Sequence, residues 1–310
     1  MQSTAKSSGW IIAGHTLGTP EHTPAEAIRL FAEAGLGGAE VIWQDGYRSG
    51  IPETANRRTL DDIRRAVHET GITVVGLTPY MSGINSLDED VRSRDLDRFR
   101  SCLNDAAALG AGVVRVYAGA YTPEQSDERS ALWDRLVASL RELAPSAAEH
   151  EITLVVENHF NTMTVTAQET ADLIATLDSP AVRVLYDQAN LTFTHSEDAE
   201  EALRIQGPLI AHVHAKDLVF VDRDRPFSAS AVATVAEDQR AVRSRVLGDG
   251  ELDWPAIVAG LLRGGYTEAF SLEYEYRWHP QDLPDPLEGF RLGGSRLRAL
   301  LDAAATAVTG

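Results

Sequence analysis

The stretch ITLVVE at residues 152–157 is a short apolar run that ends in a carboxylate, and the chain repeats this arrangement three more times. The other runs are VRVLYD (182–187), LIAHVH (209–214) and AFSLE (269–273). A carboxylate or an imidazole at the last position of a buried strand cannot face an apolar core, so it must face water, a ligand or a metal. Four such endings in succession, separated by helical segments, predict one shared polar rim.

Outward from these runs, the whole chain alternates short apolar runs with amphipathic segments. We expect strands at 10–14, 39–43, 72–77, 113–117, 152–157, 182–187, 209–214 and 269–273. We expect helices near 24–35, 58–70, 89–109, 128–150, 167–177, 198–206, 254–263 and 289–304. Eight strand-then-helix units without a domain break predict an α/β fold, a single-domain (β/α)8 TIM barrel over residues 1–310. An open doubly wound sheet is the alternative, but no G-x-G-x-x-G follows the first expected strand.

Residue types at the expected helix ends support these boundaries. Thr23-Pro24-Ala25-Glu26 and Thr166-Ala167-Gln168-Glu169 each have the spacing of a capping box. Glycines that suit a left-handed C-cap follow four helix patterns, at Gly35, Gly71, Gly110 and Gly264.

Two segments interrupt the rhythm of strands and helices. Residues 218–250 form a long loop after the seventh strand, and residues 274–288 form a proline-containing extension after the eighth. In a barrel both segments lie over the C-terminal face, where active sites are built. The loop is therefore either a lid or a surface insertion.

Composition excludes several classes of partner. The 310 residues carry 28 Lys and Arg against 46 Asp and Glu, a net charge of −18. Such a surface repels phosphate backbones and anionic membranes, so we expect neither nucleic acid nor a membrane as partner. The single cysteine, Cys102, excludes an intrachain disulfide framework. Without an apolar leader or a membrane-length apolar run, we expect a soluble, cytoplasmic protein.

The four strand endings form a donor set for a metal. Glu157, Asp187, His214 and Glu273 would provide carboxylate oxygens and one imidazole nitrogen, which suits a divalent cation such as Mn²⁺, Co²⁺, Mg²⁺ or Zn²⁺. The lack of cysteine ligands argues against a structural zinc site. The alternative is that each residue is an isolated polar strand end that water or a helix terminus satisfies.

Four short motifs resemble the xylose-isomerase-like TIM barrels, which include sugar isomerases and epimerases, inosose dehydratase and endonuclease IV. The motifs are VVENH (155–159), YDQAN (186–190), HVHAKD (212–217) and SLEYE (271–275). The resemblance covers most of the chain and implies one divalent metal, Mn²⁺ before Co²⁺, Mg²⁺ or Zn²⁺. It also implies that the chain acts on a small carbohydrate and forms a homo-oligomer or pairs with a small subunit.

By position in these motifs, Glu157, Asp187, His214 and Glu273 correspond to the family's metal ligands. His214 is preferred to His212 because it directly precedes the Ala215–Asp217 segment that matches the family pattern. In the family's epimerases, the two metal-bound glutamates also act as catalytic acid and base. The resemblance therefore implies that Glu157 and Glu273 are the acid and base. In that mechanism a proton is removed from the carbon beside a polarised carbonyl, which gives an enediolate.

The chain departs from the endonuclease IV pattern, which implies three metals and further histidines. Asn190 stands three residues after Asp187, where that enzyme has a histidine. The segment LGDGELD (247–253) also lacks its D-x-H pair. With the acidic charge, these departures disfavour DNA repair.

His159 opens a second interpretation of the chemistry. It follows Glu157 by two residues, so both side chains leave on one side if the strand continues. It is either a hydrogen-bond donor to ligands or substrate, or a general base. As a base it suits β-elimination, and the ENH element is compatible with the large subunits of C-glycoside deglycosidases, which act on 3-oxo-glycosides and pair with a small subunit.

Further residues are candidates for substrate binding on the same rim, namely His212, Lys216, Asn190, Arg115 and His15. For Lys216 the alternative is an ion pair with Asp187 or Asp217, and for Arg115 an ion pair with Glu40 inside the barrel. Trp43, Tyr117 and Phe160 stand at strand ends, where they either stack on a sugar or pack in the core.

Three functions remain open, in order of preference. The first is a metal-dependent isomerase or epimerase of a keto-sugar or related polyol carbonyl. The second is a lyase that eliminates a group from a 3-oxo-glycoside, with His159 as base. The third is a barrel that binds a sugar or a partner without turnover.

Overall fold

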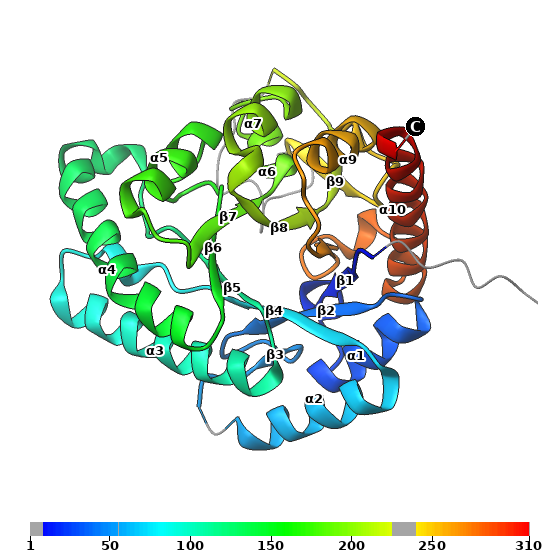
Figure 1. Cartoon of the computed structure of the whole chain (residues 1–310), viewed down its shortest axis with the longest axis horizontal. Helices are drawn as coiled ribbons and strands as arrows, with labels where there is room; N and C mark the ends of the chain where they lie inside the picture. Colours follow the sequence, from blue (N-terminus) through cyan, green and yellow to red (C-terminus); the bar gives the residue numbers. More distant parts are fainter. Residues whose placement is uncertain (1–8, 55, 225–239, 310) are drawn as a thin grey trace, which may run out of the picture.

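The computed structural model describes residues 9–54, 56–224 and 240–309, and its centre is a closed barrel of eight parallel strands (Figure 1). The barrel strands are β1 (Ile12–His15), β2 (Gly38–Trp43), β4 (Thr73–Pro79), β5 (Val113–Val116), β6 (Thr153–Glu157), β7 (Val182–Tyr186), β8 (Ile210–Ala215) and β11 (Phe270–Leu272). β1 pairs in parallel with both β2 and β11, and this closes the ring. The predicted TIM barrel is confirmed.

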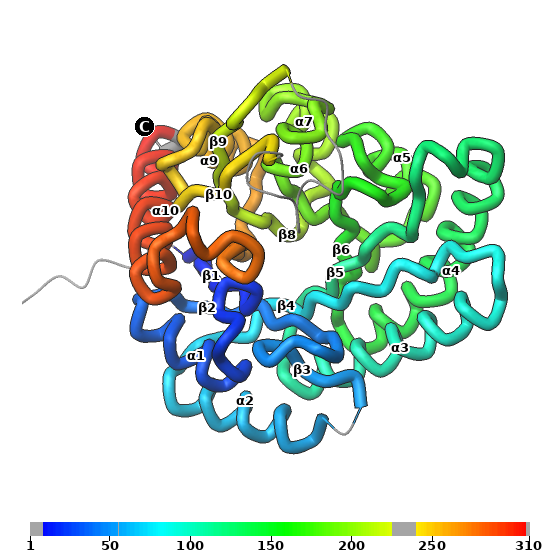
Figure 2. The backbone as a smooth tube through the Cα atoms, turned by 180° about the vertical axis from the view of Figure 1, so that it is seen from behind, coloured from blue at the N-terminus to red at the C-terminus, as the bar shows by residue number. Residues whose placement is uncertain are grey.

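Helices form the outer layer around the barrel, as both views of the backbone show (Figures 1 and 2). They are α1 (Pro24–Glu33), α2 (Arg57–Thr70), α3 (Glu89–Leu109), α4 (Arg129–Glu149), α5 (Ala167–Leu177), α6 (Gln188–Phe193), α7 (Ala199–Gln206), α9 (Trp254–Arg263) and α10 (Pro286–Thr309). All eight expected helices are present. The short α6 was not expected, because six residues carry too little periodicity to be recognised.

Both predicted capping boxes are present, at Thr23 with Glu26 and at Thr166 with Glu169. Gly71 and Gly110 are left-handed C-caps, as expected. The expectation for Gly264 is wrong: its φ is −72°, and the next residue, Gly265, takes the left-handed conformation with φ +84°.

The core lies between the barrel and its helices, where each helix buries one apolar face. On α1 this face includes Ile28 and Phe31, both fully buried. A Cβ on Gly14 of β1 would lie 2.6 Å from the Phe31 ring, so the absence of a side chain there lets the helix approach the barrel. Cys102 is also buried within this layer.

The expected loop 218–250 begins and ends with regular structure. β9 (Asp217–Phe220) and β10 (Val242–Arg245) pair as an antiparallel ribbon, while residues 225–239 lie outside the described part. The carboxylate of Asp217 accepts hydrogen bonds from four backbone N–H groups, at Leu218, Gly248, Gly250 and Leu252. This one side chain therefore holds both ends of the insertion at the top of β8.

Replacing Asp217 by Ala should lower the free energy of unfolding by about 2–4 kcal/mol, because four backbone N–H groups would lose their common acceptor. Urea denaturation followed by circular dichroism measures this loss. Asp217→Asn keeps one acceptor oxygen and should cost less. Equal stability of Asp217→Ala and the wild type would contradict this account of the insertion.

The extension after β11 is shorter than expected, because α10 already begins at Pro286. Arg240 forms an ion pair with Asp282 of this extension, so the ribbon and the extension are tied together beside the barrel mouth.

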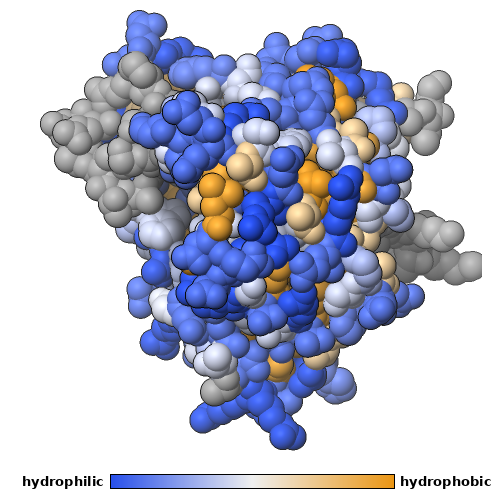
Figure 3. Space-filling model, turned by 90° about the vertical axis from the view of Figure 1, so that its left-hand side faces the viewer, coloured by the Kyte–Doolittle hydropathy of each residue, from blue (hydrophilic) through white to orange (hydrophobic). Residues whose placement is uncertain are grey.

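The outer surface is mostly hydrophilic on the side shown in Figure 3, where apolar side chains occur in small separate groups. Among the described residues, no helix has the length and apolarity needed to cross a membrane.

Candidate metal and substrate site

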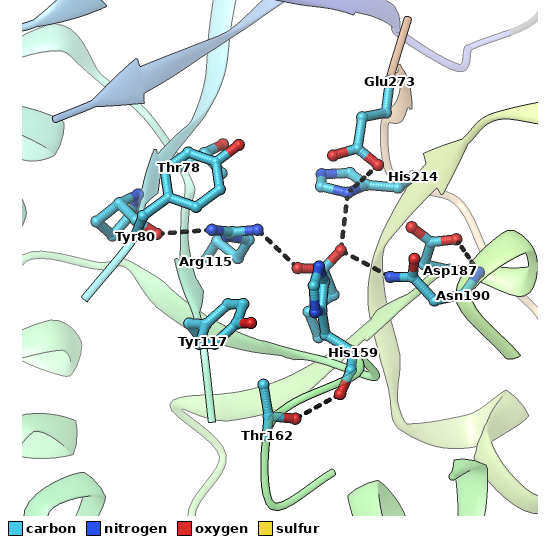
Figure 4. A network of polar contacts seen from close by, with 12 residues as sticks. Thr78, Tyr80, Arg115, Tyr117, His159, Thr162, Asp187, Asn190, His214 and Glu273 are labelled. Carbon is cyan, nitrogen blue, oxygen red and sulfur yellow. Dashed lines mark hydrogen bonds and ion pairs between the residues drawn. The ribbon is translucent and has the colours of Figure 1, made fainter. Parts of the chain in front are cut away.

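Four side chains meet at the C-terminal rim of the barrel, and Figure 4 labels three of them, Asp187, His214 and Glu273. Glu157 ends β6, Asp187 follows β7, His214 lies in β8 and Glu273 follows β11. All four are buried, and one ligand atom from each lies within 4.8 Å of the others. The expected strand endings therefore come together in space, with three carboxylates and one imidazole around a common point.

The imidazole of His214 suits a cation at that point. Its Nδ1 is buried and has no hydrogen-bond partner among the described residues. Glu157 Oε1 and Glu273 Oε2 each lie 3.5 Å from this nitrogen. A buried imidazole nitrogen that faces two carboxylates without a hydrogen bond fits a metal ligand better than a structural imidazole.

Asp187 is fixed by the helix that follows it. As the N-cap of α6, it accepts a hydrogen bond from the Asn190 backbone N–H at 3.0 Å through Oδ1. Its other oxygen, Oδ2, lies 2.9 Å from Lys216 Nζ. Burial, with the repulsion of the neighbouring Glu273 and Glu157, raises the pKa of Asp187 to about 7 despite the attraction of Lys216.

Glu157 is held by two partners, one from strand β5 and one from helix α6. Arg115 Nη1 donates to Glu157 Oε2 at 2.7 Å, and Asn190 Nδ2 donates to Oε1 at 3.2 Å. The expected pairing of Arg115 with Glu40 is therefore wrong. Burial opposes ionisation of Glu157, but the Arg115 guanidinium, together with His159 and His214, outweighs it and lowers the pKa of this carboxyl to about 2.

Lys216 lies between the carboxylates of the rim. Its Nζ is 2.8 Å from Glu273 Oε2, and Glu275 is a third, more distant partner at 3.6 Å. Of the two ion pairs weighed for Lys216, the one with Asp187 is present, whereas Asp217 binds backbone N–H groups instead. The carboxylates of Asp187 and Glu273 thus already bind one cationic side chain.

A cavity of about 340 Å³ opens above this cluster. Its charged lining residues are Arg115, Lys216, Glu273 and Glu275, and its remaining lining residues are Leu17, Tyr47, Tyr80, Ser82, Tyr117, His159, Phe160 and Trp278. This is a pocket with polar groups at its base and aromatic walls, the usual construction of a small-molecule site. Trp43 is not on this wall: it is buried and donates to Asp105.

His159 lies on the pocket wall, where its ring contacts those of Tyr117 and Phe160. Its Nδ1 lies 2.8 Å from the Phe160 carbonyl oxygen. Because a carbonyl only accepts, Nδ1 carries the proton, and the neutral ring keeps its lone pair on Nε2. Burial lowers the pKa of His159, which favours this neutral form.

The other predicted substrate residues lie behind the rim and not on the described pocket wall. His15 is buried against Thr78, His212 is buried against Glu40, and Asn190 bonds the Asn158 carbonyl as well as Glu157. Glu40, which the sequence suggested only as a partner of Arg115, contacts His212 and His214 instead. The signal for it was a carboxylate inside the apolar run AEVIW.

The profile of the xylose isomerase-like TIM barrel family matches residues 28–300. The chain belongs to this family. The match includes all four rim residues and His159. The resemblance read from the four motifs is therefore confirmed.

Individual relatives are more distant. An inosose dehydratase of Geobacillus thermodenitrificans is 31% identical over 145 residues, which cover 46% of this chain and 47% of that protein. The chain thus spans about half the length of the curated relatives it matches most strongly.

Solved structures share the whole fold at low identity. A xylose isomerase-like protein of Mycobacterium smegmatis, solved in complex with magnesium, has a TM-score of 0.73 and 20% identity, with 97% of this chain and 99% of that one covered. A 3-keto-D-glucoside 4-epimerase of Escherichia coli has a TM-score of 0.70 and 18% identity, with 94% and 99% covered.

Proposed function

We propose that the chain is a metal-dependent lyase that removes a proton beside the carbonyl of a polyhydroxylated ketone and then eliminates a β-substituent. The observation that carries this proposal is the buried cluster of Glu157, Asp187, His214 and Glu273 at the base of an aromatic-walled pocket. Its mixed oxygen and nitrogen donors suit Mn²⁺, Mg²⁺, Co²⁺ or Zn²⁺.

A divalent cation bound there supplies Lewis acidity, which makes the C–H beside a coordinated carbonyl acidic. The rest of the chemistry belongs to the protein. Aromatic rings of Tyr117, Phe160 and Trp278 on the pocket wall would shield the reacting carbon from bulk water. Lys216 and Arg115 would supply hydrogen-bond donors to the oxygens of the substrate.

The two glutamates of the rim are not equivalent, and this favours elimination over epimerisation. An epimerase that uses both as proton carriers needs each to gain and lose a proton. Both oxygens of Glu157 already have donors, Arg115 and Asn190, which hold it as an anion. Glu157 is therefore suited to hold the metal and poorly suited to carry a proton.

His159 is the base that fits the remaining step. With Nδ1–H fixed on the Phe160 carbonyl, the Nε2 lone pair is available to take the α-proton. The electron pair of that C–H bond forms the new double bond as the β C–O bond breaks. The protonated His159 then returns its proton to the leaving oxygen, so a hydroxyl leaves as water or a glycosidic oxygen as an alcohol. The dehydratase named among the relatives catalyses a reaction of this class.

Product analysis with metal-loaded protein tests the proposal. We expect an inosose or a 3-keto-glucoside to give an unsaturated ketone, seen by its ultraviolet absorbance and by mass spectrometry. His159→Gln should lower this activity by about 10²–10⁴-fold while the metal remains bound. Protein purified without chelators that holds no divalent cation, and gains no activity from Mn²⁺ or Mg²⁺, would refute the proposal.

Isomerisation or epimerisation is the second candidate. Its support is that Glu157 and Glu273 both lie 3.5 Å from His214 Nδ1, so they flank the expected metal position. Solvent deuterium that enters recovered D-tagatose or its epimer, without loss of any group, would favour this outcome. The specific ion, the cytoplasmic location, the homo-oligomer and the small partner subunit stay predictions, as does binding without turnover.

Metal affinity should rise with pH through neutrality. The pKa of Asp187 is raised to about 7 in the metal-free site, so below this pH its carboxyl is protonated and must release a proton to bind a cation. Isothermal titration with Mn²⁺ in two buffers should show proton release. If binding releases one proton, the apparent affinity for Mn²⁺ should weaken by up to about tenfold for each pH unit below 7. Affinity independent of pH between 5.5 and 8 would contradict this.

A further inference from the structure

Glu40 lies in the barrel interior behind the expected metal position, and it is 0% exposed. No arginine or lysine among the described residues forms an ion pair with it. Instead its oxygens have three partners on two strands, β4 and β8. Thr78 donates to Oε1 at 3.0 Å, His212 Nε2 lies 3.0 Å from Oε2, and His214 Nε2 lies 3.1 Å from Oε2. A buried carboxylate needs such donors, and here two of the three are imidazoles.

The contact with His214 fixes which ring nitrogen carries hydrogen. An ionised carboxylate only accepts hydrogen bonds, so His214 Nε2 must be the donor. In the neutral ring Nδ1 then carries the lone pair. That nitrogen is the one that has no hydrogen bond and lies 3.5 Å from Glu157 and Glu273. The two nitrogens of one ring thus face two different carboxylate environments.

We propose that Glu40 is a positioning residue for the metal site, which fixes the tautomer and orientation of His214 so that Nδ1 faces the cation. The inference rests on the proposed function, because it needs a metal at the Glu157, Asp187, His214 and Glu273 cluster. Carboxylates that orient metal-bound histidines in this way usually strengthen metal binding about 10–100-fold.

A second metal held by His15, Glu40 and His214 is the competing explanation, since their ligand atoms lie within 4.8 Å of one another. The hydrogen bonds of His15 argue against it. The Leu17 N–H donates to His15 Nδ1 at 3.1 Å, so Nε2 carries the proton. The hydroxyl of Thr78 uses its only hydrogen on Glu40, so His15 Nε2 donates to Thr78 Oγ1 at 3.0 Å. Neither nitrogen of His15 has a lone pair to offer.

These bonds form a directed chain that ends at Glu40. It runs from the Leu17 N–H through His15 and Thr78, and every donor along it has one acceptor. The carboxylate is therefore held from one side by Thr78 and from the other by His212, which leaves it one fixed orientation toward His214. A rigid acceptor of this kind is what selects one tautomer of an imidazole.

The test measures metal binding rather than turnover. Glu40→Gln should weaken the Mn²⁺ affinity about 10–100-fold by isothermal titration and should change the visible spectrum of Co²⁺-loaded protein. Glu268→Gln is the matched control, because it makes the same chemical change at an exposed residue that precedes β11, away from the rim. It should change the Mn²⁺ affinity less than about threefold. Equal affinity and equal spectra for Glu40→Gln and wild type would overturn the inference.

A measurement on the unaltered protein covers the case in which Glu40→Gln fails to fold. Nitrogen-15 NMR of the Zn²⁺-loaded wild type, assigned with His214→Gln, should show His214 protonated at Nε2 and not at Nδ1. The opposite tautomer would overturn the inference. If the wild type binds no Mn²⁺, Co²⁺ or Zn²⁺, both the proposed function and the role of Glu40 are refuted. If the wild type binds metal and Glu40→Gln binds it with the same affinity, only the role of Glu40 is refuted.

Discussion

Glu273→Gln should lower kcat/KM by at least about 10³-fold, together with a loss of bound Mn²⁺. Glu273 offers a ligand atom to the cluster, lines the cavity and lies 2.8 Å from Lys216. An amide keeps the shape but loses the charge, so the cation is held by two carboxylates instead of three. Removal of one metal ligand should weaken both the polarisation of the substrate carbonyl and the orientation of the substrate. Metal content by elemental analysis and initial rates on the ketone substrate measure the two effects.

The matched control for this substitution lies at the other end of the same strand. Glu268 is exposed and precedes β11, away from the rim. Glu268→Gln makes the same chemical change and should leave both metal content and rate within about twofold. Full metal content and full activity in Glu273→Gln would exclude Glu273 from the site and, with it, the proposed ligand set.

The barrel fold and the residues at its C-terminal rim could be predicted from the sequence for one physical reason. A strand buried on both faces must be apolar along its length, so a carboxylate at its last residue marks the point where the chain leaves the core. Glu157 and Asp187 carry this signal, and both lie at the C-terminal rim. The order of strands follows from the alternation with helices, because parallel neighbours need a crossover.

The partners inside the barrel could not be predicted in the same way. The sequence suggests an ion pair between Arg115 and Glu40, because both are charged residues that interrupt apolar runs. In the structure β5 pairs directly with β6, where Arg115 is opposite Val155, so Glu157 is two residues further along on the same side. β4 lies between β5 and the strand of Glu40. Which charge a buried arginine meets depends on the register of the neighbouring strands, and residue type does not fix that register.

The sequence also did not predict the elements near the site that are held in place by contacts between residues far apart in the chain. The ribbon of β9 and β10 is held by Asp217 across more than thirty residues of chain, through Gly248 and Leu252. The role of Glu40 is another example, because the three groups that contact it come from β4 and β8. Tertiary packing decides such contacts, and local propensity does not.

Arg115→Met should destabilise the protein by about 3–5 kcal/mol, the largest loss of stability we expect from a single substitution at the site. Arg115 and Glu157 are both about 1% exposed, and their charged atoms are 2.7 Å apart. Methionine fills most of the volume of the arginine stem but leaves the Glu157 carboxylate buried without its counter-ion. Arg115 Nη2 also donates to the Pro79 carbonyl, which would lose a donor. Urea denaturation of metal-free protein measures the loss.

A double substitution separates charge from packing in this prediction. In Arg115→Met with Glu157→Gln, no charge remains unpaired, so the loss of stability should be smaller than in Arg115→Met alone, by about 1–3 kcal/mol.

Arg64→Met is the surface control, since Arg64 pairs with Asp61 and its side chain is 45% exposed. This substitution should lower the free energy of unfolding by less than about 1 kcal/mol. Excess Mn²⁺ should restore part of the stability of Arg115→Met, because a bound cation supplies the positive charge that Glu157 has lost. If the double variant is no more stable than Arg115→Met, the penalty comes from packing, and Arg115 is not the residue that keeps Glu157 anionic.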